Sequence, residues 1–169
     1  MKNYTIQKSG FLGICVMLIY TIACGQERAS PAKTAEGTVN DAKITINYSS
    51  PAVKGRTIWG DLVEYGKVWR AGANEATTFE TSKDIRIEGK TLPAGKYSFY
   101  IIPNDKEGTF IFNSQTGQWG TQYDEGKDVI RIPVQFEEIN PSEERLTYNV
   151  TPTGFEIRWA DRMAKVKIE

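Results

Sequence analysis

Apolar residues recur at every second position through most of the chain, and this alternation restricts how it can fold more than any other feature. It begins at Ile44 and returns in short segments up to Ile168. Period-two alternation is typical of β-strands with one buried face, because successive side chains point to opposite faces. The positions expected in the core are Ile44, Ile46, Tyr48, Ile85, Ile87, Tyr97, Phe99, Ile101, Phe110, Phe112, Ile130, Ile132, Val134, Phe136, Leu146, Tyr148, Val150, Phe155, Ile157, Trp159, Val166 and Ile168.

Turn-forming residues separate these segments. Proline or glycine occurs within residues 92–95, 104–108, 114–117, 124–126 and 151–154, where proline fixes φ and glycine permits positive φ. No segment of helical length carries an i, i+3, i+4 apolar stripe. Roughly eight to ten short strands without crossover helices predict a single all-β domain, an antiparallel β-sandwich or a jelly-roll-like barrel.

The first 23 residues are predicted to be an export signal that does not belong to the domain. Lys2 and Lys8 precede an apolar run from Phe11 to Ala23. The run is shorter than the roughly 20 residues that a membrane-spanning helix needs, and it has the length of a signal-peptide core.

The end of this signal, Thr21-Ile22-Ala23-Cys24, resembles the lipobox of bacterial lipoproteins, with Thr21 where leucine is usual. In such proteins the cysteine thiol receives diacylglycerol before the signal is removed. The resemblance implies a mature chain that begins at Cys24 and is anchored by its acyl chains to a membrane of the bacterial cell envelope, periplasmic or outer-membrane in location. An ordinary secretory signal with an incidental cysteine is the alternative.

Residues 25–42 are small, polar and aperiodic, which predicts a flexible tether. We therefore expect a signal peptide at residues 1–23, a lipidated Cys24 with a tether over residues 24–42, and the β domain over residues 43–169. Removal of the signal takes away Lys2 and Lys8 and leaves a slight acidic excess. Such a surface gives no electrostatic reason to bind nucleic acid, and the lipid is the expected membrane contact.

The composition excludes several kinds of catalytic site. The chain has no histidine, Cys15 lies in the signal, and Cys24 would carry lipid. A Ser-His-Asp triad, a histidine-activated cysteine and nearly every catalytic zinc site are therefore excluded, and no cofactor is expected. The acidic turn with Asp124, Glu125 and Asp128 has two interpretations, a calcium site or a solvated surface turn without metal.

Carboxylates remain the one catalytic device that this composition permits. Asp61, Glu64, Glu75, Glu80, Asp84 and Glu88 lie within one third of the domain. Two of them a few ångströms apart could cleave a glycan, with Glu75 as acid or nucleophile. Solvated strand edges are the alternative interpretation of the same residues.

The segment GKVWRAGANEAT, residues 66–77, concentrates polar groups beside Trp69. Arg70 and Glu75 flank a four-residue loop, in which Gly72 is expected to take positive φ. In the first interpretation, a salt bridge between Arg70 and Glu75 holds the two ends of this loop together and is called here the Arg70–Glu75 clip. In the second, the two charged groups and Asn74 converge on a polar ligand, since arginine suits planar anions.

A second loop has the same layout, because Asn113 and Gln118 flank a turn and Trp119 follows. If both loops lie at one end of the domain, they form one pocket that involves Arg70, Asn74, Glu75, Gln118 and Trp119. The predicted function is a non-catalytic module that binds a small molecule or glycan. A carboxylate hydrolase and a passive partner in an envelope complex are the alternatives.

Three blocks of sequence carry a family resemblance. They are SSPAVKGRTIWGDLVEYGKVWRAGANEATTF, LPAGKYSFYIIP and FIFNSQTGQWG. They resemble the signature blocks of domain-of-unknown-function family 2911, uncharacterised proteins of the bacterial envelope. The resemblance runs from about Ile44 to the C-terminus and implies an envelope location and an all-β fold. It implies no activity and no catalytic residue.

Overall fold

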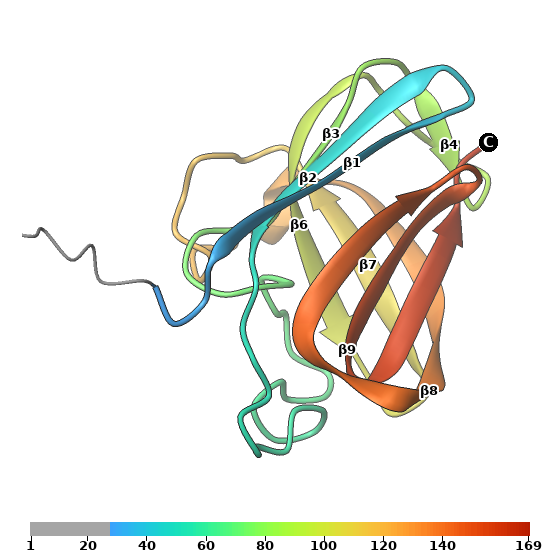
Figure 1. The fold of residues 1–169 in the computed structure, drawn as a ribbon. Coiled ribbons are helices and arrows are strands. Elements are labelled where there is room, and N and C mark those ends of the chain that lie inside the picture. Colours follow the sequence, from blue (N-terminus) through green and yellow to red (C-terminus); the bar gives the residue numbers. More distant parts are fainter. Residues whose placement is uncertain (1–27) are drawn as a thin grey trace, which may run out of the picture.

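The computed structural model describes residues 28–169, which are nearly all β-structure, as predicted (Figure 1). One antiparallel sheet has the strand order β1-β2-β3-β6-β7-β8-β9. Its strands are β1 (Ala32–Val39), β2 (Ala42–Ser49), β3 (Thr78–Thr81), β6 (Gly95–Pro103), β7 (Glu107–Asn113), β8 (Asp128–Thr151) and β9 (Gly154–Lys167). A separate hairpin joins β4 (Ile85–Ile87) to β5 (Lys90–Leu92), and a 3-10 turn, η1 (Glu125–Lys127), precedes β8. Within residues 28–169 there is no helix that could cross a membrane.

The sheet curls until it is nearly a barrel. The first part of β8 pairs with β7 and its last part pairs with β9, with register shifts between Glu138 and Thr147. These shifts bring the end of β8 against β1, where a Cβ on Gly37 would lie 2.9 Å from Val150 Cγ1. In Figure 1 the β1–β2 pair runs beside the curled β8–β9 pair.

The residues predicted from the alternation fill the interior. All of them are buried except Ile130 and Val150, which are partly buried and pack against the core. Its centre is aromatic: Phe79 and Phe112 meet edge to face at 5.0 Å, and Phe99 and Phe110 do the same at 5.0 Å. Burial of this apolar surface is the main force that holds the strands together.

The β-structure begins earlier than predicted, because β1 occupies residues that were assigned to the tether. β1 pairs with β2 from Ala32 opposite Ser49 to Val39 opposite Ala42. Its residues are mostly exposed, so the strand depends on backbone pairing and shows little alternation. The missed signal is the pair Asn40-Asp41, whose φ values of 45° and 64° fit a two-residue hairpin turn.

Residues 50–77 connect β2 to β3 without a regular strand of their own. Connections of this length without secondary structure are uncommon and are usually either functional loops or linkers. Trp69 pairs with Ile101 of β6 through bonds of 2.8 and 2.9 Å, and Thr77 O accepts from Phe99 N at 2.7 Å. The chain thus pairs with β6 at Trp69 and again at Thr77. Residues 70–76, between these two points, form a loop at the edge of the sheet.

Candidate functional site

The loop of residues 70–76 is fixed from its buried side. Ala71 is fully buried, and its carbonyl oxygen accepts bonds from Thr77 Oγ1 at 3.0 Å and Tyr148 OH at 2.7 Å. Ala71 and Asn74 have φ values of 54° and 60°, which non-glycine residues seldom adopt. Because its conformation is set by these contacts, the loop presents its outer groups in one arrangement.

Gly72 has a different role from the one predicted. Positive φ falls on Ala71 and Asn74 and not on Gly72. Glycine is required at position 72 because a Cβ there would lie 2.7 Å from Thr77 Oγ1 and 3.2 Å from Ser49 O. The sequence pattern identified the turn correctly but could not show which residue bears the unusual dihedral angle.

The two polar loops lie together. Glu75 and Trp119 form an isolated antiparallel bridge, and Gly120 N donates to Asn74 O at 3.3 Å. Gly120 is buried, and a Cβ on it would lie 2.2 Å from Arg70 Cδ. Only glycine lets the second loop approach the first this closely. The condition for one composite site, both loops at the same end of the sheet, is met.

Glu75 pairs with Arg28, and the predicted Arg70–Glu75 clip is wrong. Arg28 Nη1 lies 3.1 Å from Glu75 Oε1 in an exposed salt bridge. A bond from its own backbone N–H, together with Arg28, holds the pKa of the Glu75 carboxyl below its ordinary value. Sequence reasoning missed Arg28 because it precedes the predicted domain and lies far from Glu75 along the chain.

Gln118 is turned inward. Its Nε2 donates to Tyr100 OH at 2.9 Å and to Ser98 Oγ at 3.1 Å. Asn113 of the same loop is fully buried, and its Nδ2 donates to Asp128 Oδ1 at 2.7 Å. These two amides hold the loop in place. Gln118 therefore supports the position of Trp119, and Trp119 is the residue that faces the outer surface.

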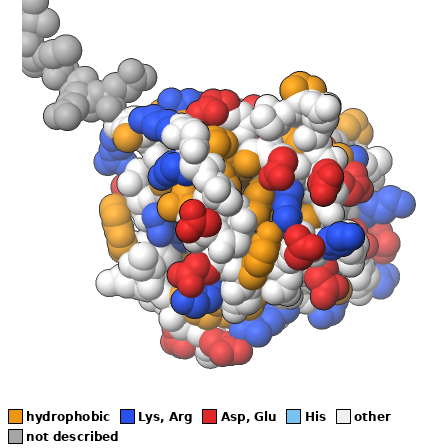
Figure 2. Space-filling model, turned by 90° about the horizontal axis from the view of Figure 1, so that it is seen from below, with side chains coloured by type: hydrophobic (Ala, Val, Ile, Leu, Met, Phe, Trp, Pro, Cys, Tyr) orange, Lys and Arg blue, Asp and Glu red, His pale blue; other side chains and the backbone are white. Residues whose placement is uncertain are grey.

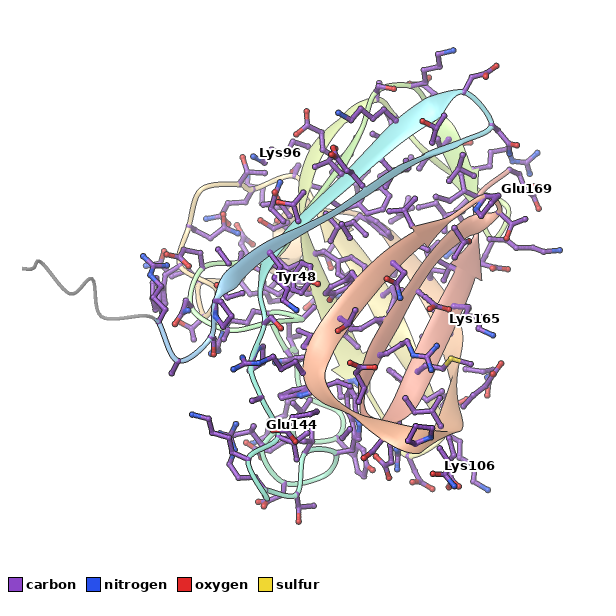
Figure 3. The ribbon with its side chains drawn as sticks, viewed as in Figure 1. Tyr48, Lys96, Lys106, Glu144, Lys165 and Glu169 are labelled. Carbon is purple, nitrogen blue, oxygen red and sulfur yellow. The ribbon has the colours of Figure 1, made fainter. Side chains whose placement is uncertain are left out.

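Trp119 is the most exposed large hydrophobic residue among those described, with 51% of its surface accessible. It borders a groove of about 380 Å³, here called the Trp119 groove, lined by Arg28, Ala29, Ser30, Asn74, Glu75 and Trp119. Glu75 also borders a neighbouring groove of about 400 Å³, whose walls include Tyr48 of β2 and Lys96 of β6 (Figure 3). The two grooves together give a polar surface with one exposed indole.

Arg70 lies outside the Trp119 groove. It lines a separate cavity of about 300 Å³, here called the Arg70 cavity, whose walls include Arg56, Leu62, Trp69 and Trp159. The structure therefore brings Asn74, Glu75 and Trp119 to one groove, uses Gln118 as a support, and directs Arg70 elsewhere.

The acidic turn before β8 is occupied by protein donors. Arg131 Nη2 lies 2.7 Å from Glu125 Oε1 and 2.8 Å from Asp128 Oδ2, and Gly126 N donates to Asp124 Oδ1 at 2.9 Å. In the described part of the chain no three carboxylate, cysteine or histidine side chains gather as metal ligands would. These contacts support the surface-turn interpretation of the acidic residues.

Comparison with known proteins identifies a family whose function is unknown. The family model described as "Protein of unknown function (DUF2911)" matches residues 30–168, from just before β1 almost to the C-terminus. No curated protein and no solved structure gives a match.

Proposed function

This chain belongs to the DUF2911 family of proteins of unknown function, and we propose that its domain is a non-catalytic module that binds a saccharide at the Trp119 groove. We further propose that a lipid on Cys24 holds the domain at the bacterial cell envelope. The observation that carries the binding proposal is the joining of the two polar loops at the Glu75–Trp119 bridge.

The chemistry of the groove suits a sugar ring. A half-exposed indole offers an apolar face on which a ring can stack. Glu75 and Asn74 border the same groove, and their oxygen and nitrogen atoms can bond to hydroxyl groups. A volume of about 380 Å³ lies at the small end of the range for ligand pockets, so one or two sugar rings are the expected occupant.

The position of the described N-terminus supports an anchor close to this groove. Arg28, which forms the salt bridge with Glu75, follows Cys24 by four residues. An extended chain covers at most about 3.6 Å per residue, so the Cα atoms of Cys24 and Arg28 lie within about 14 Å. In Figure 1 the blue start of the described chain is on the same side as the yellow-orange loop between β7 and β8. A lipid on Cys24 would thus keep the groove near the membrane surface.

No observation favours the glycan hydrolase. Among the residues that line the Trp119 groove and its neighbour, Glu75 is the one carboxylate, whereas the usual mechanism takes two. A catalytic acid also needs a raised pKa, and the pKa of Glu75 is lowered. The passive-partner alternative predicts a broad apolar patch, but the face in Figure 2 intersperses charged side chains with a narrow hydrophobic band.

A saccharide screen tests the binding proposal. The mature chain with Cys24→Ala, kept in solution, is tested on immobilised envelope polysaccharides and their fragments. Trp119→Ala and Glu75→Gln are each expected to weaken binding about tenfold, a loss of about 1.4 kcal/mol. Tyr65→Ala serves as control, since Tyr65 is an exposed aromatic residue outside the groove. The proposal fails if both groove variants bind every saccharide as well as the control does.

A further inference from the structure

Arg70 differs from the other arginines because it has no partner among the residues that the structure describes. Its Nε is buried and has no hydrogen-bond partner, and its side chain forms no salt bridge with any residue from 28 to 169. By contrast, Arg131 and Arg162 are paired with carboxylates. Burial of an N–H donor without an acceptor is unfavourable, so a missing acceptor for the Nε–H of Arg70 is the simplest explanation of its state.

The side chain is also fixed in position. The close approach of Gly120 to Arg70 Cδ and Cβ leaves the stem no room to swing toward the Trp119 groove. A second arginine, Arg56, borders the same cavity, and its guanidinium donates to Val53 O at 3.0 Å and to Ala52 O at 2.5 Å. Two arginine side chains, those of Arg56 and Arg70, therefore border one cavity, and the guanidinium of Arg70 is the one without a protein partner among residues 28–169.

The remaining walls of the Arg70 cavity set the rest of the chemistry. No aspartate or glutamate lines the cavity, so its positive charge is not neutralised from within. Trp69 and Trp159 stack at 5.6 Å with an angle of 16° between their rings, and Leu62 adds an exposed apolar side chain. The cavity therefore combines arginine side chains, which suit an anion, with apolar side chains, which suit a flat apolar group.

We propose that the Arg70 cavity binds a small anion composed of a carboxylate or phosphate head on a flat apolar body. The head is held by the guanidinium of Arg70, because arginine donates two parallel bonds to planar or phosphate oxygens. The body lies along Trp69 and Leu62. The cavity shares only Ser30 with the Trp119 groove, and this site does not depend on saccharide binding there.

The test uses benzoate and phenyl phosphate as probes, with neutral benzamide for comparison. The mature Cys24→Ala chain is titrated while the indole N–H resonances of Trp69 and Trp159 are followed by NMR. Both anions, or one of them, are expected to shift the Trp69 resonance and to bind more tightly than benzamide. The anion that binds better identifies the head group.

Variants of Arg70 decide whether the arginine is responsible. Arg70→Gln is expected to weaken anion binding about tenfold or more, and Arg70→Lys to weaken it less, since lysine keeps the charge without the paired donors. Arg86→Gln, with the same change of charge at an exposed arginine bonded to Gly89 O, is the control. If Arg70→Gln does not fold, Arg70→Lys carries the comparison.

The proposal is overturned if neither anion binds to the wild type at millimolar concentration. It is also overturned if the Arg70 variants, folded as judged by thermal unfolding, bind the anions as tightly as Arg86→Gln does. Equal affinity for benzamide and benzoate would likewise show that charge plays no part.

Discussion

Arg70 and Glu75 are five positions apart in the chain but serve different surfaces. Glu75 faces Arg28 and the Trp119 groove, whereas Arg70 lies beneath Gly120 and lines its own cavity. Sequence spacing suggested that the two charges face each other. The positive φ angles of Ala71 and Asn74 change the direction of the backbone, so that the two side chains point to different surfaces. Positive φ at a non-glycine residue is difficult to predict from a sequence.

At this scale the space around Gly72 gives a direct prediction. Gly72→Ala is expected to lower the free energy of unfolding by about 1–3 kcal/mol, because the added methyl group meets Thr77 Oγ1 and Ser49 O. Gly126→Ala is the control: Gly126 is exposed and has ordinary φ, so a change within about 0.5 kcal/mol is expected. Urea unfolding of both variants checks this, and equal losses would contradict the contact.

The raised pKa of Tyr123 predicts how the stability of the folded domain changes at alkaline pH. Burial and the Asp128 carboxylate that its hydroxyl bonds at 2.6 Å raise the pKa of Tyr123 to about 12, whereas the pKa in an unfolded chain is about 10. The neutral phenol therefore stabilises the folded state fully below pH 10, and this contribution is lost as the pH rises through about 12.

The corresponding variant is Tyr123→Phe. Its free energy of unfolding is expected to fall less steeply between pH 10 and 12 than that of the wild type, as measured by urea unfolding at several pH values. Tyr65→Phe, at an exposed tyrosine, is the control and should follow the wild type. Parallel curves for Tyr123→Phe and the wild type would refute the role of Asp128.

At the scale of elements, the alternation predicted most of the strands but did not include β1, the middle of β8 or the short strand β3, although β3 buries Phe79. Alternation located β2, β6, β7 and the two ends of β8, because each buries one apolar face. β1 was missed because its stability depends on backbone pairing with β2. The middle of β8 was not among the predicted segments, because its residues are mostly exposed and show no apolar alternation. The contact of the two loops was also beyond the sequence, since it joins residues 75 and 119.

The contact between β1 and β8 predicts an effect at Gly37. Gly37→Val is expected to destabilise the domain by about 1–3 kcal/mol, because a Cβ there lies 2.9 Å from Val150 Cγ1. Thr38→Val, at the exposed neighbouring position of the same strand, should change stability by no more than about 0.5 kcal/mol. Thermal unfolding distinguishes the two, and a neutral Gly37→Val would show that β1 does not close the sheet.

At the scale of the whole molecule, the described N-terminus lies beside the Trp119 groove. Arg28 connects the start of the described chain to Glu75, and Cys24 lies in the part of the sequence outside the described residues. An anchor at this end would present the groove to whatever lies at the membrane surface. The proposal rests on the short separation along the chain between Cys24 and Arg28.

The anchor predicts where the protein fractionates. Cys24→Ala is expected to move the protein from the membrane fraction to the soluble fraction, because stable attachment needs two or more acyl chains. Cys15→Ala, within the apolar core of the predicted signal, should leave the protein membrane-bound. Persistence of the Cys24→Ala protein in membranes after a salt wash would contradict lipid anchoring.

The most direct test of the central claim uses the four tryptophans as separate reporters in one NMR titration with the strongest-binding saccharide. Trp119 lines the Trp119 groove, whereas Trp59 and Trp159 are buried and Trp69 lines the Arg70 cavity. We predict that the indole N–H of Trp119 shifts most and that those of Trp59 and Trp159 do not move. A saturated saccharide complex with an unmoved Trp119 resonance, or the absence of any saccharide that binds, would contradict the proposed function.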